Sequence, residues 1–360
     1  MDFVIYGAQA IALGTYKAIK ELLPDYEIKC FLVTEKGDNA SVLGGIPVYE
    51  LRTFSERMSE EEKQNTEILI ATPETVMEEI ERGLQKEGFD NFVRMDSVRW
   101  SQLQQMVFAK SGRFLPVSVY PLGVHFPEIQ VYMAKFYRDK PLSGTFICPE
   151  YITDLQVGAS RTEIRVAGLL DNTGDHISER NANYSELTGL YWMWKNRILK
   201  DDNRRINYYG LAHYRRLLDM TEDDLRRLQD NDIDVVLPYP MPYEPNIEVH
   251  HERYLGSEEW RAVLTAVGEL QPMYSKTLEE VLQQEYLFNY NLIIAKGHVL
   301  DAYCEWLFPI LFRIEELVDP VGQKKPNRYI GYIGETLETL YFMHHQNDLR
   351  IVHTGCRFLL

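Results

Sequence analysis

The sequence predicts an α/β protein of two domains, and three observations support this. Near the amino end, short apolar strands alternate with helical segments, which is typical of a small parallel sheet. From about residue 114 onward, aromatic residues become dense and polar motifs follow the strands. The 360 residues are also enough for two domains of ordinary size. We therefore expect one domain over residues 1–113 and a second over residues 114–360.

The composition indicates a soluble globular protein and argues against several classes. Hydrophobic residues make up 45% of the chain and charged residues 26%. The formal net charge of −16 repels nucleic acid, so we expect no nucleic-acid partner. No stretch of eighteen apolar residues and no signal-peptide pattern occurs, which favours a cytoplasmic location. The four cysteines form no CxxC pair, which favours reduced thiols over a zinc site.

The first domain begins with a strand, a glycine turn and a helix in MDFVIYGAQAIALG. Further strands are predicted at EIKCFLVTE, IPVYE, EILIATP and NFVRM, and an amphipathic helix over 74–87. The turn matches a dinucleotide-binding fingerprint only weakly, because Gln9 and Ala10 replace the middle glycine of GxGxxG. Glu35 ends the second strand, where a ribose-binding carboxylate would lie. NAD(P) binding therefore stays open beside the simpler interpretation of a Rossmann-like scaffold.

In the second domain we expect a mixed sheet with long functional loops. Apolar runs predict strands at 116–124, 206–212, 233–237, 289–295 and 349–353. Helical periodicity predicts helices at 127–138, 183–199, 221–229, 257–268, 298–316 and 331–345. We expect Asn181 or Asn183 to cap the helix over 183–199, and Tyr191 and Trp194 to be buried on its face.

A polar loop over 149–182 contains the turn-forming run DNTGD. Asp171, Asn172, Asp175 and Asn181 are more short polar side chains than turning the chain requires. Two interpretations stay open for these four residues. They either line a polar ligand site or only shape the loop.

The segment YYGLAHYRRLL (208–218) predicts a buried strand that ends on cationic groups. Ligands of open α/β sheets bind beyond the carboxyl ends of strands, where His213, Arg215 and Arg216 would lie. Successive side chains of a strand point to opposite faces, so we expect His213 and Arg215 on one face and Tyr214 and Arg216 on the other. Guanidinium groups bind diphosphate oxygens through charge-assisted hydrogen bonds. The alternative is that the arginines pair with the protein's own carboxylates: Asp171, Asp175 or Asp219.

One pair of aspartates and one pair of histidines resemble metal ligands in sequence. Asp232 and Asp234 form a DxD, but it precedes an apolar run, so it predicts a helix-to-strand turn. His250 and His251 are adjacent and cannot both face one point, which disfavours a metal pair. We expect His251 to donate a hydrogen bond to the substrate instead.

Three further polar residues stand out in the last third of the chain. Asn289 and Asn291 fall in a predicted strand, where a buried amide needs partners from the protein or from a ligand. Glu335 is predicted near a helix start, behind two glycines. There it either complements the positive helix end or serves as a general base.

Seven ordered motifs resemble one bacterial family: DLQVGAS, LLDNTGDHIS, NANYSELTGLYWMWKN, YYGLAHYRRLL, YNLIIAK, YCEWLFPILF and RYIGYIGETL. In order and spacing they resemble the glycosyltransferase domain of capsular polysaccharide and exopolysaccharide biosynthesis. That family was formerly labelled a domain of unknown function and includes galactofuranosyltransferases. The resemblance covers about 114–360. The first domain is similar to the N-terminal domain of bacterial sugar O-acyltransferases, with GGIPVYEL as a counterpart.

The resemblance implies a GT-A-like fold, in which a nucleotide-sugar lies at the carboxyl edge of a mixed sheet. It implies transfer of a hexose, galactofuranose or galactose, from a UDP-sugar to a growing, lipid-linked bacterial surface polysaccharide, with inversion. Family members usually carry a His-Lys pair after the first strand. His125 is the expected histidine of this pair, and Phe126 stands where the lysine would follow.

Glycosyl transfer requires a group that stabilises the departing diphosphate and a base for the acceptor hydroxyl. GT-A enzymes normally meet the first need with a divalent metal, Mg²⁺ or Mn²⁺, held by a DxD motif. Because no well-placed DxD is present, we expect the cationic side chains to take over part or all of this role. The expected donor-binding residues are His125, Asn172, Asp175, Asn181, His213, Arg215 and Arg216. The expected base is Glu335, then Asp171, and the expected acceptor or sugar contacts are His251 and Asn291.

Two rival functions remain open on the sequence. One is a non-catalytic, nucleotide-sugar-binding partner in a polysaccharide assembly complex. The other is an NAD(P) oxidoreductase that uses residues 1–110. For the transferase we expect a nucleotide-sugar donor and a glycan or glycolipid acceptor as partners. A lipid-linked acceptor implies peripheral contact with the inner face of the cell membrane, although no basic amphipathic helix supports it.

Overall fold

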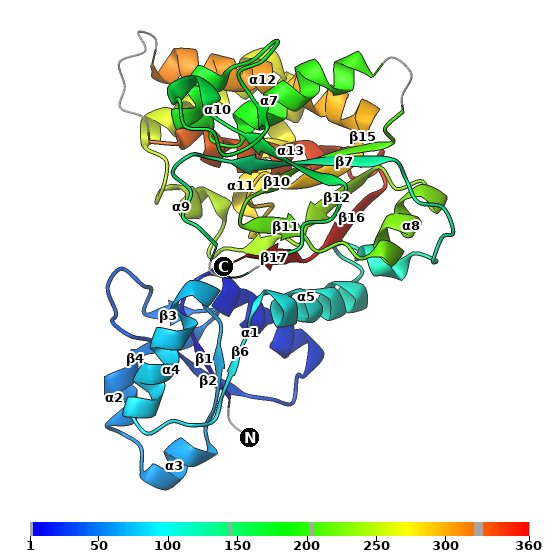
Figure 1. Ribbon diagram of the computed structural model, residues 1–360. Helices are drawn as coiled ribbons and strands as arrows, with labels where there is room; N and C mark the ends of the chain where they lie inside the picture. Colours follow the sequence, from blue (N-terminus) through cyan, green and yellow to red (C-terminus); the bar gives the residue numbers. More distant parts are fainter. Residues whose placement is uncertain (1–2, 143, 145, 202–204, 320–326, 360) are drawn as a thin grey trace. The chain divides into compact units, whose positions relative to one another are not determined.

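A computed structural model describes residues 3–142, 144, 146–201, 205–319 and 327–359 (Figure 1). The described chain divides into two compact units. Residues up to Arg113 form the first unit together with Met241–Pro245. The second unit consists of Phe114–Pro240 and Asn246–Leu359.

The first unit is a six-stranded sheet with the order β3-β4-β2-β1-β5-β6. Its strands are β1 Phe3–Tyr6, β2 Ile28–Val33, β3 Val42–Leu43, β4 Ile46–Glu50, β5 Glu67–Ile70 and β6 Phe92–Arg94. Its helices are α1 Ala10–Leu22, α2 Leu51–Ser55, α3 Glu60–Asn65, α4 Met77–Lys86 and α5 Ser97–Ser111. All neighbouring strands are parallel except β3 and β4, so the expected Rossmann-like parallel sheet is confirmed.

Gly7 forms the turn between β1 and α1. Its φ is +128°, and a Cβ at this position would lie 2.5 Å from the carbonyl oxygen of Ala71, just after β5. Only glycine therefore fits between these strand ends. Gln9 follows, and its Nε2 donates to Asn39 Oδ1 at 2.7 Å. The glycine is explained by packing within the unit, and NAD(P) binding at this turn stays a prediction.

The second unit is built on a mixed sheet with the order β16-β12-β15-β10-β7-β8-β9. Its strands are β7 Ile129–Lys135, β8 Ile152–Gln156, β9 Leu169–Leu170, β10 Tyr208–His213, β12 Val235–Pro238, β15 Ile293–Lys296 and β16 Ile351–Thr354. β10, β7, β8 and β9 run parallel, whereas β15 is antiparallel to both of its neighbours. β11 (Arg216–Leu218) pairs with β10 and with β17 (Cys356–Phe358).

Two elements expected from the sequence are wrong in this unit. The helix expected over 127–138 is the strand β7, which is hydrogen-bonded to β10 on one side and to β8 on the other. A strand buried on both faces lacks the alternation that would distinguish it from a helix. The strand expected over 116–124 is irregular chain with a 3₁₀ turn at Val117–Val119. The first strand of this unit therefore begins later than the sequence indicated.

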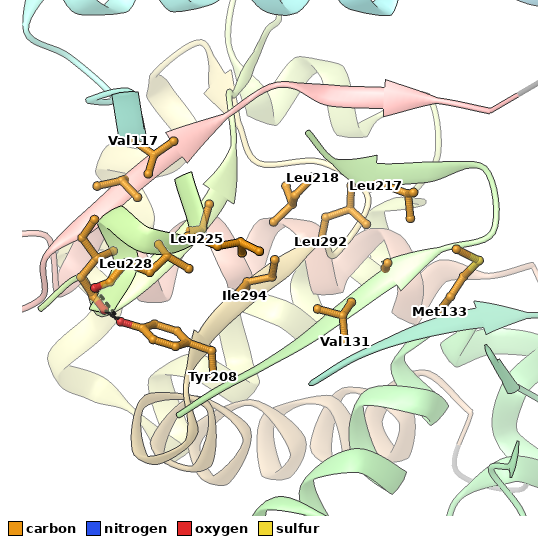
Figure 2. Close-up of a cluster of buried hydrophobic side chains, with 14 of the residues drawn as sticks. Val117, Val131, Met133, Tyr208, Leu217, Leu218, Leu225, Leu228, Leu292 and Ile294 are labelled. Carbon is orange, nitrogen blue, oxygen red and sulfur yellow. Dashed lines mark hydrogen bonds between the residues drawn. The ribbon is translucent and has the colours of Figure 1, made fainter. Parts of the chain in front are cut away.

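An apolar cluster packs on one face of the sheet, against α8 (Glu222–Asp230) (Figure 2). It includes Val131, Met133, Leu217, Leu225, Leu228, Leu292 and Ile294. The Tyr208 hydroxyl lies in this cluster and donates to the carbonyl oxygens of Ile233 at 2.6 Å and Leu228 at 3.0 Å. Side chains alternate along a strand, so Tyr208 and Ala212 face this cluster and His213 faces the opposite side.

The remaining helices of this unit are α6 Asn181–Tyr184, α7 Leu187–Asn196, α9 Ile247–His251, α10 Ser257–Leu270, α11 Ser275–Gln283, α12 Gly297–Val318 and α13 Tyr329–His344. On the face opposite the cluster, Tyr132 of β7 meets Trp192 of α7 edge-on, with ring centroids 5.7 Å apart. Trp194 is buried and stacks on Phe308 of α12, as expected, while Tyr191 is half-buried beside it. None of the helices formed by the described residues is long and apolar enough to cross a membrane.

Candidate functional site

A cavity of about 420 Å³ lies at the carboxyl edge of three parallel strands. β7, β8 and β10 are neighbours in the sheet, so the residues that follow them meet at one edge. The cavity is lined by Phe136 after β7, Val157 after β8 and residues 213–216 after β10. The junction of α6 and α7 and the side chain of Arg328 complete its wall. This is the edge at which open α/β sheets bind ligands.

The strand β10 does not continue through the arginines. It ends at His213, the turn consists of Tyr214 and Arg215, and β11 begins at Arg216. His213 and Arg216 form an antiparallel pair, and directly opposite residues lie on the same face. The expectation that His213 shares a face with Arg215 is therefore wrong, because a tight hairpin replaces the extended strand. All four residues nevertheless line the cavity.

Among the described residues, the arginines of the cavity have no close acidic partner. Within the part of the chain that the structure describes, Arg215, Arg216 and Arg328 form no ion pair with a carboxylate. The three aspartates proposed as partners are engaged elsewhere. Asp171 accepts from backbone amides and hydroxyls, Asp175 accepts from a tyrosine hydroxyl, and Asp219 pairs with Arg357 at 2.8 Å. The internal ion-pair interpretation is therefore wrong for these residues.

Aromatic rings and a hydroxyl hold the guanidinium groups in place. Arg216 lies over the ring of Tyr290, 4.1 Å from its centroid, and Arg215 lies 5.2 Å from that of Tyr214. Nε of Arg215 is buried and has no hydrogen-bond partner among the described residues. Arg328 donates from Nε to Ser185 Oγ at 3.1 Å. These contacts orient the positive charges without cancelling them, so we call this space the cationic cavity.

His213 is the fourth basic group of the cationic cavity. Burial lowers its pKa below the ordinary value, and the nearby arginine charges lower it further, while Glu186 opposes the shift. The imidazole is therefore neutral near pH 7. Its Nδ1 is buried and has no hydrogen-bond partner among the described residues, which leaves this atom available for a ligand.

Asp171 organises the turn that follows β8. The side chain is fully buried and accepts from the backbone N–H of Gly158 and Ala159 at 2.8 and 3.0 Å. The hydroxyls of Ser178 and Thr188 donate to the same carboxylate. Both oxygens are thus occupied by the fold. The geometry assigns Asp171 to the framework of the site and does not support its use as a base.

Of the other polar residues in this loop, Asn181 lines the cationic cavity and the structure places Asn172 and Asp175 outside its wall. Asn181 Nδ2 donates to the carbonyl oxygen of Ser185 at 2.7 Å. Neither Asn181 nor Asn183 caps the expected long helix, because that helix is broken into α6 and α7. Asn183 Oδ1 instead accepts from the backbone N–H of Asn327 at 3.2 Å.

A turn before β15 holds two acidic side chains. The strand expected over 289–295 begins only at Ile293. Asn291 Nδ2 donates to Oε1 of Glu186 at 2.7 Å. The side chain of Asn289 and the backbone N–H of Tyr290 donate to the two carboxylate oxygens of Glu335, each at 3.0 Å. The amide of Asn291 therefore binds a carboxylate of the protein, and its role as a sugar contact stays a prediction.

Glu335 lies in the second turn of α13, and not at a helix start. Gly331 and Gly334 are helical, so no glycine turn exposes this carboxylate. A Cβ at Gly334 would lie 2.9 Å from Asn291 Oδ1, so glycine lets α13 approach the turn before β15. Burial raises the pKa of Glu335 to about 7, and the charge of Glu186 adds to the shift.

Unusual backbone conformations gather around this site. The described residues include six non-glycine residues with positive φ, and four of them belong to this region. They are Ser185 (51°), Tyr290 (76°), Asn291 (49°) and Arg328 (64°). Such conformations cost free energy and concentrate at functional sites. The strain supports the site independently of its charges.

Two histidines expected at the site lie elsewhere. His125 is exposed on the chain before β7, and its Nδ1 lies 2.8 Å from Asp230 Oδ1. His251 is buried at the end of α9, where it stacks on Trp260 and its Nε2 lies 2.7 Å from Thr336 Oγ1. Neither residue lines the cationic cavity, so their expected roles in binding the donor and the acceptor stay predictions.

A lysine ends the first strand of the second unit. β7 ends at Lys135 and is followed by Phe136, so His125 lies before the first strand and not after it. Lys135 Nζ donates to Asp154 Oδ2 at 2.5 Å. The expectation that His125 follows the first strand is therefore wrong, and the missing lysine of the family pair stays a prediction.

A second cavity of about 430 Å³ adjoins the cationic cavity. The two share Phe136, Asp139 and Tyr214 in their walls. Apolar and aromatic side chains, including Tyr137, Leu142 and Phe146, form most of the remaining wall of the second cavity. Lys135 and Asp154 also lie on this wall. We call this space the apolar cavity. The two spaces together suit a ligand with one anionic part and one flat, less polar part.

A divalent metal is what a DxD motif would hold, but Asp232 and Asp234 both bind Lys296 and stand before β12. The described carboxylates on the wall of the cationic cavity are Asp139 and Glu186, and both accept hydrogen bonds from the protein. Among the described residues no three acidic, histidine or cysteine side chains lie close enough to hold a metal ion. This donor set fits an anion better than Mg²⁺ or Mn²⁺.

Sequence reasoning missed Glu186, Asp139 and Arg328. Glu186 was within reach, because it is an isolated acid beside a strongly apolar helix face in NANYSELTGLYWMWKN. Asp139 was hidden by the wrong helix assignment, since it lies in the turn after β7. Arg328 carries no sequence signal, because its place depends on how α13 packs against the α6–α7 junction.

Comparisons with known proteins place this geometry in context. A family model described as a domain of unknown function, DUF4422, matches residues 143–347. No curated protein sequence matches the chain. The solved apo structure of the bifunctional glycosyltransferase WbbM is similar, with a TM-score of 0.56 and 26% sequence identity over 64% of this chain. This chain covers 45% of that protein, less than half of its length.

A second solved structure, core-mannan synthase A from Aspergillus fumigatus in a Mn/GDP form, has 10% identity and a TM-score of 0.22. The alignment covers 92% of this chain and 68% of the synthase chain. A TM-score this low does not indicate a shared fold. The match to WbbM and the mixed sheet together confirm the GT-A-like fold of the second unit.

Proposed function

Because the chain belongs to the DUF4422 family, and because its fold matches a solved glycosyltransferase, we propose that it is a glycosyltransferase acting on a nucleotide-sugar. The observation that carries the proposal is the hairpin after β10. It presents His213, Arg215 and Arg216 at the carboxyl edge of the sheet without a carboxylate partner among the described residues. Two guanidinium groups without a close acidic partner favour an anionic ligand.

The donor is a nucleoside diphosphate-sugar. Its diphosphate lies in the cationic cavity, where the guanidinium groups of Arg215 and Arg216 donate to the phosphate oxygens. The unpartnered Nδ1 of His213 faces the same space. The nucleobase lies in the adjoining apolar cavity, against Phe136 or Tyr214 in the shared wall. A UDP-sugar carrying galactofuranose or galactose is our specific assignment.

In the transfer step, an acceptor hydroxyl forms a bond to the anomeric carbon of the sugar. The bond between that carbon and the diphosphate breaks, and the electron pair leaves with the diphosphate. The cationic side chains stabilise the negative charge that develops there. Because the donor set of the cavity does not fit a divalent metal, this stabilisation comes from the side chains of the cavity. Activity in excess chelator tests this point directly.

The acceptor is a growing bacterial surface polysaccharide on a lipid carrier, and the reaction proceeds with inversion. This places the protein at the cytoplasmic face of the cell membrane, where it makes peripheral contact. The resemblance to capsular polysaccharide enzymes motivates these finer assignments. Transfer to a radiolabelled glycolipid fraction, followed by linkage analysis, tests them.

Calorimetric titration of the full chain with UDP, GDP and inorganic pyrophosphate tests the donor proposal. We expect saturable binding of one nucleoside diphosphate and weaker binding of pyrophosphate. No binding of any of the three would refute the proposed function. If nucleotide binds but no nucleotide-sugar turns over with any glycan acceptor, the chain is the non-catalytic binding partner instead.

A further inference from the structure

Two carboxylates line the cationic cavity, and they differ in how they are held. Oδ2 of Asp139 accepts from the backbone N–H of Phe136 at 2.7 Å and closes the turn after β7. Glu186 is only 7% exposed and stands at the start of α7, on the same wall as His213. Its Oε1 accepts from Asn291, and its Oε2 makes no hydrogen bond with the described residues. One oxygen of Glu186 is thus fixed and the other is open.

Glu335 is held differently from Glu186. Both of its oxygens accept hydrogen bonds, from Asn289 and from the backbone of Tyr290, and it does not line the cavity. These bonds fix the turn in which Tyr290 and Asn291 adopt positive φ. The same turn carries the ring under Arg216 and the amide that binds Glu186. Glu335 therefore acts on the cavity through this turn.

We propose that Glu186 is the catalytic base of the transfer and that Glu335 is a positioning residue acting through Asn291. The inference rests on the proposed function. The acceptor hydroxyl gives its proton to Oε2 of Glu186 while its oxygen bonds to the anomeric carbon. The sugar–diphosphate bond breaks, and its electron pair leaves with the diphosphate toward Arg215 and Arg216. The proton thus passes to Glu186, and the electron pair leaves with the diphosphate.

The experiment compares Glu186→Gln, Glu335→Gln and Glu269→Gln in the full chain. Glu269 pairs with Arg313 away from the cavity and serves as the matched control. Each variant is given UDP-galactopyranose or UDP-galactofuranose, with methyl galactoside as acceptor, and the release of UDP is measured from pH 5 to pH 9. UDP affinity is measured separately by calorimetry, and folding by thermal denaturation.

We expect Glu186→Gln to lower the rate at least about 100-fold, the usual scale for loss of a general base, with UDP affinity changed less than about 3-fold. In the wild-type chain we expect the rate to fall at acidic pH, where a general base becomes protonated. This fall should be absent in Glu186→Gln. Glu335→Gln should lower the rate by roughly 10-fold and keep the acidic fall, because the base remains. The charge of Glu186 acts on His213 of β10 and on Glu335 and Glu338 of α13. Asp139, Arg215, Arg216 and Arg328 are the other charged groups on the same wall of the cavity.

The proposal is overturned if Glu186→Gln keeps more than half of the activity, or if Glu335→Gln alone removes both the rate and the acidic fall. The second result would make Glu335 the base. Failure of the wild-type chain to bind UDP is a separate result, which overturns the proposed function and this inference with it. A loss of UDP affinity in Glu186→Gln equal to its loss of rate would also overturn the assignment.

Discussion

His213 and Arg216 lie directly opposite each other across the tight turn that joins β10 to β11. The imidazole and the guanidinium therefore face the cationic cavity together, at a spacing set by backbone hydrogen bonds. Arg216 is also fixed from behind by the ring of Tyr290. A pair fixed in this way loses little conformational entropy when it binds a diphosphate.

The first prediction concerns the charge of Arg216. Arg216→Ala should weaken UDP binding about 10- to 100-fold, because a charged hydrogen bond contributes about 1.5–3 kcal/mol. Calorimetry measures the effect. Arg357→Ala is the matched control, because Arg357 pairs with Asp219 and does not line the cavity, and we expect less than about 2-fold change there. Equal losses in the two variants would contradict a specific role for Arg216.

The apolar cavity leads to a prediction about selectivity. Phe136→Ala should weaken UDP binding by about 1–3 kcal/mol, the usual contribution of stacking a base on an aromatic ring. The affinity for inorganic pyrophosphate should stay within about 2-fold, because the cationic side chains are untouched. Parallel titrations with the two ligands make this comparison. A loss shared by both ligands would place Phe136 with the diphosphate instead.

Asp171 should matter for stability first. Asp171→Asn replaces an acceptor of four hydrogen bonds by a group that brings its own N–H toward buried donors. We expect a loss of at least about 2 kcal/mol in unfolding free energy, measured by urea denaturation. Asp175→Asn is the exposed control and should change stability by less than about 0.5 kcal/mol. A stable, inactive Asp171→Asn protein would restore Asp171 as a candidate base.

Two helical glycines should respond in opposite ways to alanine. In Gly334→Ala, the new Cβ would lie 2.7 Å from Leu187 Cδ1 and 2.9 Å from Asn291 Oδ1. We expect a loss of about 1–3 kcal/mol in stability and weaker turnover, because α13 must move away from the turn that holds Glu186. Gly268→Ala in α10 meets no atom within 4 Å and should be neutral or stabilising by up to about 1 kcal/mol. Thermal denaturation and UDP release distinguish the two.

Buried histidines should make the second unit sensitive to acid. Burial lowers the pKa of His251 and of His353 to about 4 and that of His250 to about 3. The unfolded chain binds more protons than the native chain between these values and the ordinary value of 6.5, so stability should fall as pH drops through this window. Glu335, with its pKa raised to about 7, acts in the opposite sense between pH 7 and 4.5.

Urea midpoints measured between pH 7 and pH 4 test this behaviour in wild type and in His251→Asn. The variant should show a shallower pH dependence than wild type, because one group that resists protonation is gone. His298→Asn, at an exposed position, should keep the wild-type slope. Identical slopes in all three proteins would contradict the assignment.

Much of the fold could be predicted because local signals agree with the tertiary structure. The alternation of strands and helices in the first unit and the helices α8, α10, α12 and α13 follow hydrophobic periodicity. The strand β7 could not be recognised, because a strand buried on both faces has the continuous apolar pattern of a buried helix. That single error placed His125 after the first strand of the unit, although it lies before β7.

The cationic part of the site could also be found from sequence, because it is contiguous. YYGLAHYRRLL contains the strand, the turn and the basic groups in one segment. The acidic part could not, because Glu186, Asn291 and Glu335 come from three elements far apart in the chain. The hairpin itself was missed, since Tyr214-Arg215 carries none of the glycine or asparagine signals of a tight turn.

The last strand of the unit has a consequence for how the protein is made. β17 pairs with β11, and the ring of Phe358 lies 5.7 Å from the guanidinium of Arg216. These residues stand far after β11 in the sequence, so this contact closes a very long loop and forms only after almost all of the unit has left the ribosome. Nascent chains that stop short of residue 356 would carry the hairpin without its second flank. The wall of the cationic cavity is therefore supported from this side only after the last strand of the unit has been made.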